Sequence, residues 1–306
     1  MKNVKVRVPA TVANLVCGFD ILGMALNDPY DEMELTLLNE PGISIKHTDE
    51  FNLPGGVTEN VAGVALQALL EEYNKPVGFD LVVHKHIKPG SGLGSSAAGS
   101  AGAVVAANYL LDNYFSKEDL VRFAMHGEKL ASGVMHADNI APAIYGGITL
   151  IRSILPLDII PLGSPALFIT VVHPQIEVKT SDARQILPKD VPLKDAIRQW
   201  GNIAGLITGI LKNDLSLIGR SLEDVIIEPV RSILIPGFDE VKRRSKEAGV
   251  LGGGISGSGP SVFMVSENEN TAQQVEREMI EIFSRLDVGF KTYVTTINGE
   301  GVRIVS

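Results

Sequence analysis

The segment that decides the fold reads Lys88-Pro89-Gly90-Ser91-Gly92-Leu93-Gly94-Ser95-Ser96-Ala97-Ala98. It follows a strand-like run, 79–87, and opens a helix-like run, 95–111. Three glycines in this loop let the backbone turn sharply and approach a ligand closely. The helix behind them directs its unpaired N–H groups and its positive dipole end at the loop. The segment therefore predicts a loop that cradles a polyphosphate, with a tight turn before a buried helix as the alternative.

The order of residues in this loop narrows the prediction. It is not a Walker loop, which requires Gly-Lys-Ser/Thr, and it is not the dinucleotide pattern with three spaced glycines. The run Gly-Leu-Gly-Ser-Ser-Ala-Ala resembles the phosphate loop of the GHMP kinases, a family that includes galactokinase and mevalonate kinase. The resemblance implies that ATP is a co-substrate and that residues 88–98 bind it.

Length, charge and cysteine content set broader limits. A chain of 306 residues is long enough for about two domains. The single cysteine, Cys17, excludes an internal disulfide and favours a reducing, cytoplasmic location. A formal charge of −9 argues against non-specific binding to nucleic acid. The uncharged run 91–111 could span a bilayer by length, but its Gly, Ser, Ala and Asn content predicts a buried helix and no membrane partner.

Hydrophobic periodicity predicts an α+β chain. Strands are expected at 4–8, 32–38, 43–47, 148–152, 166–173, 261–266 and 291–297, and helices at 61–73, 116–130, 193–211, 238–248 and 271–286. The helix at 116–130 begins with a capping box in which Asp119 stands in place of the usual Glu. A Pro-rich stretch, 155–165, has the composition of a linker with one short strand, so two domains are expected, 1–155 and 156–306.

Polar residues directly after the first strand form a second signal. The segment 9–20 contains Asn14 and Asp20, whose oxygen atoms are suitable acceptors for an ammonium group. A turn in which Asn and Asp bond to their own backbone explains the same spacing.

A third signal is Glu128, followed eight residues later by His136-Ala137-Asp138-Asn139. A carboxylate near a phosphate loop suits Mg²⁺, which takes one or two carboxylates together with phosphate oxygens. His136 and Asp138 have no second histidine at helical spacing, which disfavours zinc.

Two segments in the second half carry further candidates. The runs 180–184 and 227–231 each end in an arginine, Arg184 and Arg231, and two converging arginine forks would suit a carboxylate. The sequence does not show whether they converge. The run 252–260 is mostly Gly and Ser, and it is typical either of a flexible loop or of a turn packed under the phosphate loop.

Taken together, these segments resemble the homoserine kinase branch of the GHMP kinases, in the family's order and over nearly the whole chain. The resemblance implies a ribosomal-protein-S5-like N-terminal domain and a ferredoxin-like C-terminal domain. It implies Mg-ATP-dependent phosphorylation of L-homoserine to O-phospho-L-homoserine, a step of threonine biosynthesis. The sequence does not determine the oligomeric state, and a homodimer is one assembly that it leaves open.

The resemblance also assigns roles to residues. Metal ligands would be Ser96 and Glu128, and Asn60 would lie near the adenosine, beside the ATP-binding run 88–98. Substrate-binding positions would be Asn14, Asp20, His136, Asn139, Arg184 and Arg231, and catalytic positions would be Asp138, Asn139 and Thr180. Because the amide of Asn139 cannot remove a proton at neutral pH, no essential general base is expected. The competing interpretation makes Asp138 the base.

One departure from the family pattern and two other functions stay open. Val16 stands where the family has glycine, and a β-branched residue would be costly there if the backbone required a positive φ. Another small-molecule kinase of the family is one alternative function. A catalytically inactive, ligand-sensing relative is the other, although the presence of both Ser96 and Glu128 argues against it.

Overall fold

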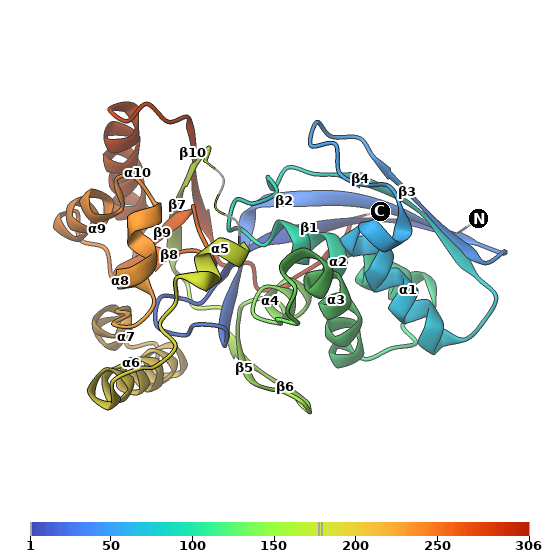
Figure 1. Ribbon diagram of the computed structural model, residues 1–306, viewed down its shortest axis with the longest axis horizontal. Coiled ribbons are helices and arrows are strands. Elements are labelled where there is room, and N and C mark those ends of the chain that lie inside the picture. The colour runs from blue at the N-terminus through green and yellow to red at the C-terminus, as the bar shows by residue number, and fades with distance from the viewer. Residues whose placement is uncertain (1, 177, 179, 306) are drawn as a thin grey trace.

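Two β-sheets lie next to each other along the long axis of the molecule, and helices pack against each of them (Figure 1). The structure is a computed structural model that describes residues 2–176, 178 and 180–305.

The larger sheet is built mainly from the first half of the chain. Its main path runs β11-β1-β2-β4-β3, and β5 pairs with both β2 and β6. Among the described strands of this sheet, only the β3–β4 pair is parallel. The strands are β1 (Asn3–Ala13), β2 (Leu22–Leu38), β3 (Gly42–His47), β4 (Gly78–His84), β5 (Ile148–Ile154), β6 (Leu157–Gly163) and β11 (Arg303–Ile304).

Helices cover one face of this sheet (Figure 1). They are η1 (Val57–Glu59), α1 (Val61–Tyr73), α2 (Ser95–Leu110), α3 (Lys117–Ser132) and α4 (Ile140–Tyr145). The central helix, α2, is buried along most of its length, as its small residues predict. A Cβ atom at Gly102 would lie within 3 Å of side-chain atoms of Val8 and Met33, so only glycine permits this close approach of helix and sheet. Within the described residues, no helix combines the length and hydropathy needed to cross a membrane.

The second half of the chain forms a four-stranded antiparallel sheet with the order β10-β7-β9-β8. Its strands are β7 (Phe168–Pro174), β8 (Gly252–Ile255), β9 (Val262–Ser266) and β10 (Phe290–Thr296). The helices are α5 (Thr180–Gln185), α6 (Leu193–Lys212), α7 (Leu215–Ser221), α8 (Glu228–Arg231), η2 (Ser232–Leu234), α9 (Phe238–Glu247) and α10 (Glu269–Ser284). Apolar residues of α9 and α10, among them Val241 and Phe283, pack in one core with Val172 of β7 and Met264 of β9.

The two sheets are joined directly. Leu26 of β2 forms a bridge with Ile297, and the N–H of Asp28 donates to the hydroxyl of Thr295 at 2.9 Å. This junction holds the two halves of the chain so that loops from both can line one cavity.

Most of the expected elements are confirmed, and the main differences concern the segments that form β6 and β8, each of which pairs with the neighbouring strand of a hairpin. The capping box of α3, with Ser116 and Asp119, is present. The stretch 155–165, expected as a linker with one short strand, contains the strand β6, which pairs back along β5 in the larger sheet instead of linking two domains. The change from one sheet to the other therefore lies between Gly163 and Phe168, shortly after the predicted boundary. The glycines at 252–254 form the strand β8 instead of a loop, because they pair with β9.

Candidate active site

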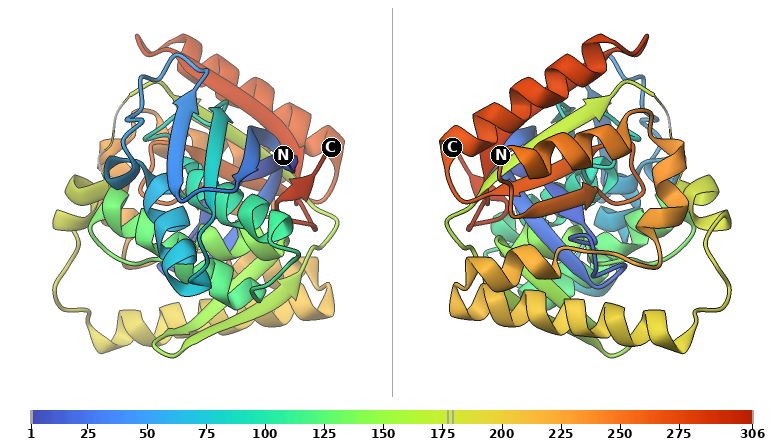
Figure 2. Two further views of the ribbon diagram at one scale, coloured as in Figure 1. Left: turned by 90° about the vertical axis from the view of Figure 1, so that its right-hand side faces the viewer. Right: turned by 90° about the vertical axis from the view of Figure 1, so that its left-hand side faces the viewer.

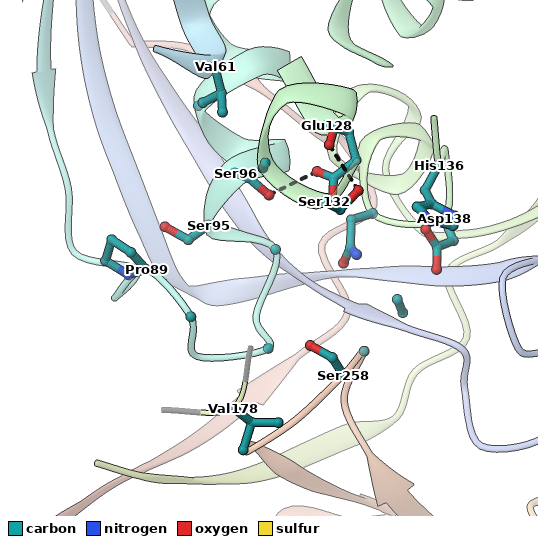
Figure 3. Close-up of a pocket in the computed structure, with 18 of the residues that line it drawn as sticks. Val61, Pro89, Ser95, Ser96, Glu128, Ser132, His136, Asp138, Val178 and Ser258 are labelled. Atoms are coloured by element: carbon teal, nitrogen blue, oxygen red, sulfur yellow. Dashed lines mark hydrogen bonds between the residues drawn. The ribbon is translucent and has the colours of Figure 1, made fainter. Parts of the chain in front are cut away.

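A cavity of about 520 Å³ lies where the two halves of the chain meet. The phosphate loop, the start of α2 and the C-terminal part of α3 line it from the first half, and Arg184, Arg231 and Gly257 line it from the second. This volume lies within the ordinary range for small-molecule sites. Figure 3 shows part of the lining, with Ser96, Glu128, His136 and Asp138 around the cavity.

The phosphate loop needs its glycines for two separate reasons. Gly90, Gly92 and Gly94 all have positive φ angles, of 73°, 78° and 68°, which favour glycine. In addition, a Cβ at Gly92 would contact the carbonyl oxygens of Ser256 and Gly259, and a Cβ at Gly94 would contact the hydroxyl of Thr11. The loop is therefore packed on the glycine-rich segment after β8, one of the two arrangements expected for that segment.

The predicted ATP-binding residues divide into two groups. Pro89, Gly90, Gly92, Gly94, Ser95 and Ser96 line the cavity, whereas Lys88, Ser91, Leu93, Ala97 and Ala98 are not among its lining residues. The Lys88 ammonium donates instead to Gln175 Oε1 at 2.8 Å, and the Ser95 hydroxyl donates to the carbonyl of Ile87 at 2.8 Å. The first amide groups of α2 remain the natural anion-binding groups at this end of the cavity.

Ser96 and Glu128 lie together, as predicted for a metal site. The Ser96 hydroxyl donates to Glu128 Oε2 at 2.8 Å (Figure 3). Burial raises the pKa of Glu128, and its side-chain partners are the hydroxyls of Ser96 and Ser132. A cation at this point would compensate the buried carboxylate, so the residues fit Mg²⁺. The described residues contain no group of three or more His, Cys, Asp or Glu that could hold a metal ion by themselves.

Asp20, His136 and Arg184 converge at the other end of the cavity. Arg184 Nη2 lies 3.0 Å from both carboxylate oxygens of Asp20 and 3.0 Å from His136 Nε2. Burial is the main cause that lowers the pKa of His136, so its neutral ring accepts a hydrogen bond from Arg184.

The second arginine of the site, Arg231, is also part of this end. Arg231 is buried and donates to the carbonyls of Ala183 and Gly257 at 3.0 and 3.1 Å. The ring of Phe19 lies between the arginines, 5.6 Å from the guanidinium of Arg184 and 5.0 Å from that of Arg231. The two guanidinium groups thus share one aromatic ring at one end of the cavity.

Asn14 holds this corner together through both atoms of its amide. Its Oδ1 accepts from the N–H of Asp20 at 3.0 Å, and its Nδ2 donates to the carbonyl of Gly257 at 2.9 Å. Asn14, Leu15 and Val16 have φ angles of 75°, 41° and 66°. Val16, which stands where the family has glycine, therefore has the left-handed backbone conformation that favours glycine. The side chain of Val16 lies beside Gly254, and a Cβ atom added at Gly254 would lie 3.3 Å from Val16 Cγ2.

Asp138 and Asn139 lie between the two ends of the cavity. Asp138 is buried, and burial, followed by the charges of Asp20 and Glu128, raises the pKa of its carboxyl group to about 7. The Thr11 hydroxyl donates to Asn139 Oδ1 at 2.7 Å. Because Oδ1 accepts this bond, the other amide atom of Asn139, Nδ2, is the one that would donate to a ligand. Thr180 begins α5, and its side chain lies outside the part of the chain that the structure describes.

The end of the cavity beside the phosphate loop contains the predicted residue Asn60, together with residues that the sequence analysis missed. Asn60 caps α1 by accepting from the N–H of Ala62 at 2.9 Å, and its Nδ2 lies 2.9 Å from His47 Nε2. Lys85 lines the cavity, and its ammonium lies 2.5 Å from Asp31 Oδ2 and 3.1 Å from the carbonyl of Ser95. A lysine in the strand-like run before the phosphate loop was the signal that could have identified Lys85. Thr11 and Phe19 carried no such signal.

Comparisons with known proteins agree with this geometry. The family described as "GHMP kinases N terminal domain" matches residues 60–147, and "GHMP kinases C terminal" matches residues 206–285. The homoserine kinase of Chlorobium phaeobacteroides (strain DSM 266) is 45% identical, with 100% of both chains covered. That of Chlorobaculum tepidum is 45% identical, with 100% of this chain and 99% of the relative covered.

A solved structure gives the same result. The crystal structure of homoserine kinase from Cytophaga hutchinsonii superimposes with a TM-score of 0.95 at 46% identity, covering 100% of this chain and 98% of that one. The expected two-domain α+β fold is thereby confirmed. The chain belongs to the GHMP kinase family, in its homoserine kinase branch.

Proposed function

We propose that this chain transfers the γ-phosphoryl group of ATP to the hydroxyl of L-homoserine and releases O-phospho-L-homoserine and ADP, as a step of threonine biosynthesis. The observation that carries the proposal is the pairing of two sites in one cavity. One end has the phosphate loop with Ser96 and Glu128, and the other has two arginines beside a carboxylate.

The end of the cavity that contains the two arginines suits a zwitterionic amino acid. Arg184 and Arg231 would bind the carboxylate, and Asp20, with Asn14 beside it, would accept from the ammonium group. In the structure Arg184 is held by Asp20 and His136, so homoserine would replace part of this pairing with its own two charges. A mevalonate or galactose site would have no use for an ammonium acceptor.

Phosphoryl transfer requires the protein mainly to position the two substrates and to neutralise the charge of the phosphates. Ser96 and Glu128 would hold Mg²⁺, which supplies neutralisation of the phosphate charge when bound. Asn139, oriented by Thr11, would donate to the homoserine hydroxyl, and Thr180 would lie beside the path of the phosphoryl group. A loose transition state needs little prior deprotonation of the nucleophile, so the proton would pass late to a phosphate oxygen. Asp138, whose pKa of about 7 suits a general base, carries the competing mechanism.

The test is a coupled assay of ADP release with L-homoserine and Mg-ATP, with the product identified by mass spectrometry. Turnover that requires homoserine, and gives phosphohomoserine, supports the proposal. Turnover with a different alcohol from a substrate panel, and none with homoserine, would reassign the chain to another kinase of the family. Binding without turnover would favour a ligand-sensing role.

Location and assembly are separate parts of the proposal. We place the protein in the cytoplasm, because its one cysteine, Cys17, is buried and forms no disulfide. This location is independent of the reaction proposed above. A homodimer, one assembly that the sequence leaves open, is likewise independent of the reaction.

A further inference from the structure

One buried amide links the two segments that form the end of the cavity with the two arginines. Gln199 lies on the inner face of α6, the helix that runs along the lower edge of the molecule in both views of Figure 2. It is 5% exposed. Its Nε2 donates to the carbonyl of Cys17 at 2.8 Å, and its Oε1 accepts from the N–H of Val225 at 3.1 Å. Gln199 is not among the residues that line the cavity, so it acts on a ligand only through other residues.

The first of these hydrogen bonds holds a loop, 14–20, whose backbone conformation is costly. Four residues of this loop other than glycine have positive φ angles, between 41° and 75°: Asn14, Leu15, Val16 and Asp20. Such conformations persist only where the surrounding structure enforces them. Cys17 lies in the middle of the loop, and Phe19 and Asp20 follow within three residues. The bond from Gln199 to the Cys17 carbonyl therefore fixes the part of the loop that carries the aromatic ring and the carboxylate of the site.

The second hydrogen bond holds the segment that leads to Arg231. Val225, whose N–H is bound by Gln199, lies three residues before the first residue of α8. Its neighbour Asp224 fixes the start of that helix, because its carboxylate accepts from the N–H groups of residues 226–228 at 2.9 to 3.0 Å. Arg231 is the last residue of α8, one helical turn later. The position of its guanidinium group thus depends on where α6 holds this segment.

We infer that Gln199 is a positioning residue for the amino-acid substrate, an inference that rests on the proposed function. The amide of Gln199 sets the separation between the loop 14–20 and α8, and so between the groups that the two segments place in the site. The ring of Phe19 lies 5.0 Å from the guanidinium of Arg231 across this junction. A carboxamide suits the role because it has a donor and an acceptor in one rigid plane, which match a carbonyl and an N–H.

The phosphate loop is held by contacts that do not include Gln199. The hydroxyl of Ser256 donates to the carbonyl of Gly92 at 2.6 Å, and the hydroxyl of Ser95 donates to the carbonyl of Ile87. Loss of the Gln199 amide should therefore weaken the binding of homoserine and leave the binding of Mg-ATP nearly unchanged. A residue that only stabilised the packing of α6 would not separate the two substrates in this way.

The test is steady-state kinetics of Gln199→Met, in which a side chain of similar length keeps the packing and loses both hydrogen bonds. KM for homoserine should rise by about 10-fold or more, because two buried backbone groups lose their partner. KM for ATP should stay within about 2-fold and kcat within about 3-fold of the wild type, the pattern of lost substrate binding. The matched control is Leu206→Ala on the same face of α6, a buried residue without a hydrogen-bonding side chain. That control should lower the thermal unfolding midpoint and leave both KM values unchanged.

A second measurement needs no substrate. In hydrogen exchange followed by mass spectrometry, peptides that cover 14–20 and 225–231 should exchange faster in Gln199→Met than in the wild type, and peptides that cover 90–98 should not. Gln199→Asn keeps a polar side chain but is one carbon atom too short to reach both partners, so it should show the same pattern and serves if Gln199→Met does not fold.

The two measurements separate failure of the inference from failure of the proposed function. A wild type that does not turn over homoserine would contradict the proposed function, and the exchange experiment would still test the role of Gln199. Unchanged exchange in 14–20 and 225–231 would overturn the inference. So would an equal rise in both KM values for Gln199→Met, or a rise in KM for homoserine of the same size in Leu206→Ala.

Discussion

Replacing Asp138 with Asn removes a carboxyl group whose ionisation opposes folding. The pKa of this group rises from an ordinary value of 3.8 to about 7 in the folded protein, chiefly because the group is buried. Between these pH values the folded chain keeps a proton that the unfolded chain has released. The free energy of unfolding therefore falls as the pH rises through this window. A difference of about three pKa units corresponds to about 4 kcal/mol in total.

The variant Asp138→Asn cannot ionise, so its stability relative to the wild type should depend on pH. From about pH 5 to pH 8 the difference in unfolding free energy should move by about 2.5 kcal/mol in favour of the variant. Urea unfolding at the two pH values measures it, and titrating groups that do not interact with Asp138 cancel in the comparison. The control is Asp112→Asn, an exposed carboxyl group, for which we expect a shift below about 0.5 kcal/mol. The reasoning is refuted if the difference in unfolding free energy between Asp138→Asn and the wild type is the same at both pH values.

The same variant decides the mechanism. At saturating homoserine and Mg-ATP, a loss confined mainly to KM would support phosphoryl transfer without an essential base. A fall in kcat of about 10³-fold, in a folded variant that binds both substrates, would identify Asp138 as the general base.

Further substitutions test the site and the backbone beside it. Glu128→Ala should lower kcat by about 100-fold or more, and unchanged activity would contradict its role as a metal ligand. Arg184→Lys and Arg231→Lys keep the charge but lose the fork, so KM for homoserine should rise while KM for ATP stays nearly constant; a selective loss of ATP affinity would assign them to the nucleotide. Thr11→Val should lower kcat by about 10-fold because the amide of Asn139 loses its fixed orientation, and Thr11→Ser should restore it; equal kcat in both would exclude that role. Val16→Gly should lower the unfolding free energy by about 1 kcal/mol, because the lost burial exceeds the relieved backbone strain; a more stable variant in thermal or urea unfolding would reverse that order.

The phosphate loop and the longer helices were predictable because their rules are local, whereas the short helices α4, α5, α7 and α8 were not expected. Positive φ angles at Gly90, Gly92 and Gly94 follow from the turn between β4 and α2. The cap of α3 depends on two residues three positions apart. The pairing of Ser96 with Glu128, by contrast, came from the resemblance, because the two lie 32 residues apart.

The pairing of strands was only partly predictable. The stretch that contains β6 reads as a linker with one short strand because its prolines weaken the strand pattern, and β8 reads as a loop because it consists largely of glycine. In both cases a neighbouring strand supplies the hydrogen bonds that stabilise the extended backbone.

The sequence by itself determined the family, and it predicted the groups that carry the chemistry: a phosphate loop, a carboxylate for a metal, and arginines with an acidic residue for a zwitterion. Tertiary structure alone decided where those groups meet. Asp20 and Arg184 are 164 residues apart in the chain, and Thr11 and Asn139 are 128 apart, yet each pair is in hydrogen-bond contact. The direction of a side chain depends on how distant segments pack, and a residue pattern records only the local part of that free energy.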